Sequence, residues 1–100
     1  MPDAGFTRSY LAEWYWPGVR EKALAAALSR AGAAVSQLRN EGRLVDLRAT
    51  ILVRSDETVF CLFDGVESDI RSAGELAGRP FERVLESVWL EPRGHEDEEA

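Results

Sequence analysis

The sequence predicts an α+β domain in which two helices cover one face of a four-stranded antiparallel sheet. The spacing of hydrophobic residues changes along the chain in the order strand, helix, strand, strand, helix, strand. Turn-forming residues separate these segments. The chain has 100 residues, of which 45% are hydrophobic and 30% charged, and this balance suits one small globular domain.

The first half of the pattern is a strand followed by a long helix. Residues 7–16 mix aromatic and β-branched side chains, as strands do, and stop at the turn signal Pro17-Gly18. From Arg20 to Asn40 the apolar residues lie three and four positions apart, which is typical of one face of a helix. The residues of this apolar stripe are Leu24, Ala27, Leu28, Ala31, Val35 and Leu38.

The second half begins with a hairpin. Residues 44–54 alternate between apolar and polar types, and residues 58–63 are again β-branched and aromatic, so a polar turn joins two strands. A short helix is predicted over residues 68–77, before a Gly-Arg-Pro segment that ends it. Residues 83–90 are the last predicted strand.

This order of elements is that of the ferredoxin-like βαββαβ arrangement, whose sheet has the strand order 4-1-3-2. We expect a single domain over residues 7–91 and an acidic, disordered tail over residues 92–100. The N-terminal residues lack the features of a signal peptide, and the longest apolar stretch is far shorter than a membrane span. A single cysteine cannot form an internal disulfide, so we expect a cytoplasmic protein.

Charge and motifs exclude several classes of function. The net charge is −6, and residues 96–99 supply four of the negative charges, so the remaining body has no electrostatic reason to bind nucleic acid. The sequence contains no Ser/His/Asp set, no glycine-rich phosphate loop and no cluster of histidine or cysteine ligands. These observations favour a non-enzymatic protein.

The helix-free face of the sheet is the surface predicted to carry function. The apolar row from Val45 to Val53 should face the helices, which turns the alternate residues of that strand, and those opposite them in the hairpin, outward. Glu13 and Glu86 are also expected on the outer face, because a charged side chain should avoid the apolar side that the helices cover. The predicted outer face consists of Leu11, Glu13, Tyr15, Asp46, Arg48, Thr50, Leu52, Val59, Cys61, Phe63, Val84, Glu86 and Val88.

A second copy of the chain is the simplest cover for so apolar a face, so we expect a homodimer with a cavity between its two sheets. The candidate ligand-binding residues are Glu13, Tyr15, Arg48, Thr50, Cys61 and Glu86. The two glutamates could share a proton, hold a cation or simply pair with arginines. Cys61 fits either a buried apolar residue or a thiolate activated by Arg48.

Three segments resemble a family of small bacterial proteins, domain-of-unknown-function family 4242. They are Glu13–Gly18, Asp56–Cys61 and the Ala-Gly-Arg-Pro segment that runs from Ala77 to Val84. The resemblance implies a ferredoxin-like dimer and a nickel-responsive protein, with nickel as the possible divalent metal. Members often carry a histidine in the second helix, whereas residues 70–75 contain none, so no metal ligand is carried over.

The alternative function is enzymatic. Dimeric α+β barrels resembling small monooxygenases and polyketide cyclases share this architecture, and their pockets would lie between sheet and helices or between subunits. Fold alone does not choose between these activities.

Overall fold

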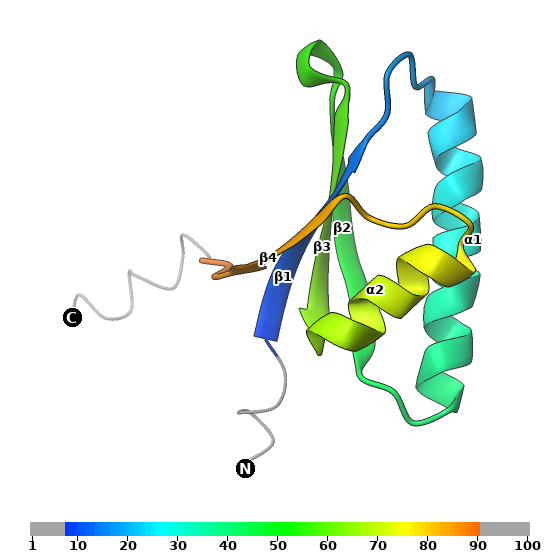
Figure 1. Cartoon of the computed structure of the whole chain (residues 1–100), viewed down its shortest axis with the longest axis vertical. Helices are drawn as coiled ribbons and strands as arrows, with labels where there is room; N and C mark the ends of the chain where they lie inside the picture. Colours follow the sequence, from blue (N-terminus) through cyan, green and yellow to red (C-terminus); the bar gives the residue numbers. More distant parts are fainter. Residues whose placement is uncertain (1–7, 91–100) are drawn as a thin grey trace, which may run out of the picture.

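The computed structural model describes residues 8–90, which form one sheet and two helices (Figure 1). The elements are β1 (Arg8–Tyr15), α1 (Glu21–Asn40), β2 (Val45–Val53), the 3-10 turn η2 (Arg54–Asp56), β3 (Thr58–Gly65), α2 (Glu67–Leu76) and β4 (Arg83–Ser87). All three strand pairs are antiparallel, and the strand order β2-β3-β1-β4 is the predicted order read from the other edge. The α+β fold class is therefore confirmed. The predicted tail, residues 92–100, lies outside the described residues.

Both helices lie on the same side of the sheet (Figure 1). The predicted stripe of α1 packs onto it, with Leu24, Ala27, Ala31, Val35 and Leu38 all buried. The alanines bring the helix axis close to the strands because they add little volume. Within residues 8–90, neither helix has the length and apolar character that crossing a membrane requires.

Aromatic residues fill the core between the sheet and the segment that follows α2. The Trp14 ring is fully buried and stacks on Phe81, with ring centroids 4.8 Å apart, while its indole nitrogen donates a 2.6 Å hydrogen bond to the Arg79 carbonyl oxygen. Phe63 meets Phe81 edge to face at 5.6 Å. A Cβ atom at Gly74 would lie 2.7 Å from the Phe81 ring, so only glycine lets α2 come this close. These contacts fix the connection between α2 and β4.

A β-bulge makes β2 change faces partway along its length. The register with β3 shifts between Leu47 and Ala49, so Arg48 is an extra residue in the strand. Val45 and Leu47 face the helices as predicted, but beyond the bulge Ala49, Ile51 and Val53 face outward. The prediction that the whole apolar row faces the helices is wrong for this second part.

The bulge also reverses the predicted faces of the hairpin. The expected pairs Val53–Thr58, Ile51–Phe60 and Thr50–Cys61 all form. The faces were nevertheless assigned from the apolar row of β2, which beyond the bulge faces outward. The hairpin residues predicted to face outward therefore face the helices. Thr50, Leu52, Val59, Cys61 and Phe63 lie on the helix side, and the last three are fully buried.

β4 is shorter than predicted and also presents the opposite face. It ends at Ser87, which pairs with Ser9 near the beginning of β1. Val84 is buried on the helix side, and Glu86 shares its side of the strand. Both were predicted to face outward. Glu86 still reaches solvent, because it lies at the exposed end of the edge strand and forms an ion pair with Arg8 at 3.5 Å.

Candidate functional site: the open sheet face

The open sheet face is the side of the sheet opposite the helices. Alternate residues of each strand lie on it, and in β2 the alternation shifts by one residue at the bulge. Its residues are Ser9, Leu11, Glu13 and Tyr15 of β1, Asp46, Ala49, Ile51 and Val53 of β2, Thr58, Phe60, Leu62 and Asp64 of β3, and Arg83, Leu85 and Ser87 of β4. Arg48 reaches it from the bulge through Asp64. Of the predicted outer residues in the strands, the structure keeps Leu11, Glu13, Tyr15, Asp46 and Arg48.

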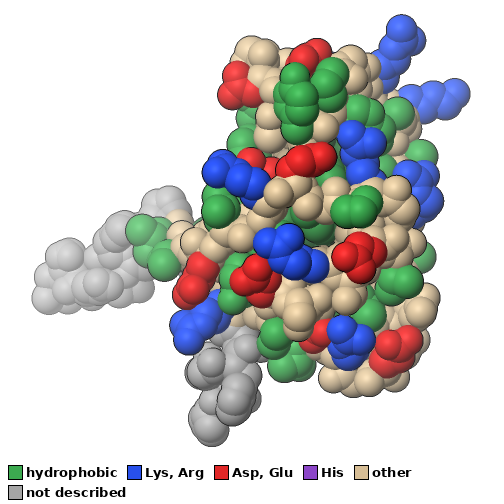
Figure 2. Space-filling model, in the orientation of Figure 1, with side chains coloured by type: hydrophobic (Ala, Val, Ile, Leu, Met, Phe, Trp, Pro, Cys, Tyr) green, Lys and Arg blue, Asp and Glu red, His purple; other side chains and the backbone are tan. Residues whose placement is uncertain are grey.

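The centre of the open sheet face is apolar. Leu11 lies in register between Leu62 on β3 and Leu85 on β4, which forms a row of three leucines across three strands. Phe60 and Ile51 lie side by side in the next row, and Ile51 is 60% exposed. In contrast, the side of the molecule seen in Figure 2 intersperses acidic and basic side chains among the hydrophobic ones. The leucine row is therefore the apolar centre of the side of the sheet on which neither helix lies.

One ion pair is set into this apolar surface. Both carboxylate oxygens of Glu13 accept hydrogen bonds from Arg83, at 3.2 Å from Nε and 3.1 Å from Nη2. The Glu13 side chain is only 14% exposed, while that of Arg83 is 61% exposed. A two-pronged pair of this kind fixes the orientation of the carboxylate. The structure therefore places Glu13 beside Arg83 and not beside Glu86, which lies on the other side of the sheet.

A second polar group marks one end of the open sheet face. Asp64 forms an ion pair with Arg48 at 2.5 Å and accepts a 2.8 Å hydrogen bond from the Ser9 hydroxyl. The Arg48 guanidinium also lies over the ring of Trp89, 5.0 Å from its centroid. Trp89 follows β4, on the opposite edge of the sheet from β2, so the side chains of Arg48 and Trp89 meet over the open sheet face.

Cys61 and Thr50 belong to the core and not to this site. Burial raises the pKa of the Cys61 thiol to about 11, although a hydrogen bond from Thr50 lowers it in part. The thiol therefore stays protonated at neutral pH, and thiolate chemistry requires the ionised form. Of the two interpretations given for Cys61, the structure favours the buried apolar residue.

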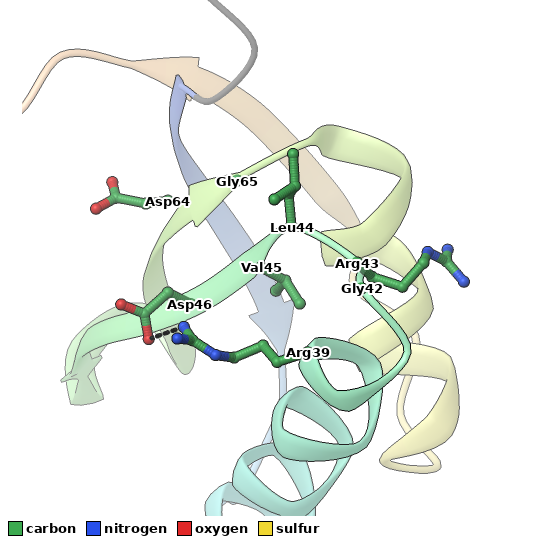
Figure 3. A pocket seen from close by; sticks show the side chains of 8 residues that line it. All are labelled: Arg39, Gly42, Arg43, Leu44, Val45, Asp46, Asp64 and Gly65. Atoms are coloured by element: carbon green, nitrogen blue, oxygen red, sulfur yellow. Dashed lines mark ion pairs between the residues drawn. The ribbon is translucent and has the colours of Figure 1, made fainter. Parts of the chain in front are cut away.

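A shallow pocket of about 390 Å³ opens beside the polar end, where α1 ends and β2 begins (Figure 3). Arg39 and Asp46 face each other there and form an ion pair at 3.4 Å. Arg43 points away from the pocket, toward Asp69, which it meets at 2.5 Å. Each of these charges is already paired within the chain, so the pocket offers little to a ligand.

Within residues 8–90, no three histidine, cysteine, aspartate or glutamate side chains lie close enough together to hold a metal ion. On the open sheet face, Asp46 and Asp64 are register partners while Glu13 lies farther along β1, and each of the three carboxylates is beside an arginine.

Sequence reasoning missed the residues that make up most of the open sheet face. Ile51, Phe60 and Leu62 were assigned to the helix side or left unassigned, because the bulge at Arg48 has no sequence signal of its own. Leu85 was left unassigned because the charge of Glu86 was used to set the face of β4. The alternation of β3 gave one usable signal. Two phenylalanines three residues apart, Phe60 and Phe63, must face opposite ways, so one of them had to lie on the open face.

No family model and no curated protein matches the chain. Among solved structures, the protein SCO4226 from Streptomyces coelicolor A3(2) is similar, with a TM-score of 0.71 and 15% sequence identity. The match covers 83% of this chain and 99% of that one. At this level of identity the similarity establishes a shared fold, a four-stranded sheet with two helices.

Proposed function

We propose that this protein is a non-enzymatic homodimer, which packs through its open sheet face and binds a small ligand between the two sheets. The observation that carries the proposal is the row of Leu11, Leu62 and Leu85, with Phe60 and Ile51 beside it, on a face to which neither helix is applied. Contiguous apolar surface of this kind marks interaction sites.

The energetics of burial favour a second copy as the partner. Covering one large aliphatic or aromatic side chain contributes about 1.5–3 kcal/mol. A two-fold contact buries the same residue in both copies, so each residue of the face contributes once per copy. Two sheets pack well at a separation of about 10 Å, because their side chains interdigitate.

The charged residues of the open sheet face are compatible with this contact. Glu13 is neutralised by Arg83, and Asp64 by Arg48, so neither pair would bring an unpaired charge into the interface. The same groups supply the few oriented polar contacts by which a small ligand is held in a mostly apolar site. A metal ion, which the family resemblance implies, would need carboxylates from both copies.

The dimer is tested by measuring the mass of the protein in solution with light scattering. We expect twice the monomer mass of 11.1 kDa, and we expect Leu62→Glu to return the protein to the monomer. The matched control is Leu76→Glu, which changes an equally large exposed side chain on α2, away from the open sheet face. A wild-type monomer, or a dimer that tolerates Leu62→Glu, would contradict the proposal.

The ligand is tested by native mass spectrometry of the dimer, purified without a histidine tag so that no metal is recruited by the tag. We expect additional mass on the wild-type dimer that is absent from an Arg83→Ala dimer. If the dimer has no additional mass, even after incubation with cell metabolites and with nickel, the ligand part of the proposal is wrong and the dimer has a structural role only.

A further inference from the structure

The last three described residues, Val88–Leu90, form an apolar segment that has left the sheet, and we call it the C-terminal arm. Val88 is 80% exposed and Leu90 is 77% exposed, the two largest values among the exposed large hydrophobic residues of the described chain. Figure 2 shows hydrophobic side chains projecting from the body at the end of β4. Neighbouring apolar side chains that are this exposed point to a surface with a partner.

The side chain at the middle of the C-terminal arm reaches over the open sheet face. Trp89, in its centre, lies against the guanidinium of Arg48, which belongs to β2 on the far edge of the sheet. Arg48 is itself held by Asp64 of β3. These contacts fix the middle of the arm over the polar end of the open sheet face, while Val88 and Leu90 remain uncovered.

The length of the C-terminal arm matches the distance it would have to cross. Three extended residues span about 10 Å. Two sheets packed face to face are separated by about 10 Å. An arm that starts at the edge of one sheet and turns over its open face can therefore reach the facing sheet of a second copy.

We propose that the C-terminal arm of each copy crosses the interface and packs on the open sheet face of the other copy. The inference rests on the proposed dimer and adds to it a reciprocal exchange, since a two-fold axis makes both arms cross. Each copy thereby covers part of the leucine row of its partner, and Val88 and Leu90 lose their exposure. When the arm crosses, Trp89 leaves its own Arg48, so that all three residues of the arm are free to span the interface.

Photo-crosslinking of the full chain tests the exchange directly. Leu90 is replaced by p-benzoylphenylalanine, and the protein is irradiated at a concentration at which the wild type is dimeric. We expect a covalent product of twice the monomer mass, in which the crosslink joins residue 90 of one chain to β1 or β3 of the other. The same replacement at Leu76 on α2 is the control and should yield no such product. A crosslink confined to the same chain would overturn the proposal.

The contribution of the C-terminal arm to association is tested with the double variant Val88→Ser, Leu90→Ser. Both side chains are exposed in the single chain, so the substitutions should leave its fold intact. We expect the dimer to dissociate at a concentration at least about tenfold higher than the wild type, because two apolar contacts per copy are lost. Leu76→Ser should leave association unchanged.

The outcomes separate the two proposals. If Leu62→Glu dissociates the dimer and the double variant does not weaken it, the arm exchange is wrong and the dimer stands. If the wild type is monomeric at every concentration tested, both proposals are wrong.

Discussion

The two faces of this sheet contain similar numbers of large apolar residues, yet both helices cover the same one of them. The helix side combines bulky Trp14 and Phe63 with small Ala12, Ala27 and Ala31, and all five are essentially without exposed surface. The open sheet face instead consists of leucines, Phe60 and Ile51, with ion pairs among them. Hydrophobicity therefore does not distinguish the two faces, whereas the small residues Ala27 and Ala31 of α1 allow the helix to pack closely on one of them.

A matched pair of phenylalanines on β3 gives the largest expected difference between the two faces. Phe63→Ala should lower the free energy of unfolding by about 3–5 kcal/mol, because it opens a cavity in a closed core. Phe60→Ala leaves a half-buried site that solvent can fill, so its loss should be at most about half as large. Urea denaturation at low protein concentration measures both, because dilution removes any contribution from dimerisation. Equal losses would mean that the open sheet face is already covered within one chain.

Two helical glycines, one against the packed core and one facing open space, should give effects of intermediate size on the free energy of unfolding. Gly74→Ala should destabilise the fold by about 1–3 kcal/mol, because the added methyl group would meet the Phe81 ring in a packed core. Gly32→Ala, in α1, meets nothing within 4 Å and should stabilise the protein by up to about 1 kcal/mol. Thermal or urea unfolding of the two variants should thus shift in opposite directions. A shift in the same direction would show that α2 can move away from Phe81.

The ion pair on the open sheet face gives the smallest expected effect. Arg83→Ala leaves the largely buried Glu13 carboxylate without its partner and should cost about 1 kcal/mol. Arg71→Ala removes a half-exposed helix pair with Glu67 and should cost no more than about 0.5 kcal/mol. Denaturation in low and high salt separates them further, because exposed pairs are screened more strongly. If Arg83→Ala were no more costly than Arg71→Ala, Glu13 would be better hydrated than its position indicates.

The sequence predicted the order of the elements well because that prediction rests on periodicity and turn residues, which are local. It also predicted the pairing of the hairpin, since counting residues across a short turn aligns Val53 with Thr58. The faces of β1 were correct too, because Glu13 avoids the core.

The faces of β2, β3 and β4 could not be predicted in the same way. One additional residue at Arg48 inverts every assignment beyond it, and an unbroken alternation gives no sign of where a bulge will form. The charge of Glu86 was misleading because Glu86 lies at an exposed end of β4, where a side chain on the helix side of the sheet also reaches solvent. The position of Trp89 depends on a contact with Arg48, some forty residues away in sequence, which no local pattern indicates.

The bulge in β2 has a consequence for how the protein behaves at high concentration. β2 is an edge strand, and the unpaired backbone groups of such a strand can recruit strands from other molecules. At Arg48 the hydrogen-bonding positions of β2 are displaced by one residue and the local twist increases. A regular strand from another molecule could therefore not pair along the whole length of β2. The irregularity that defeats prediction from sequence therefore also interrupts the template on which an aggregating sheet would grow.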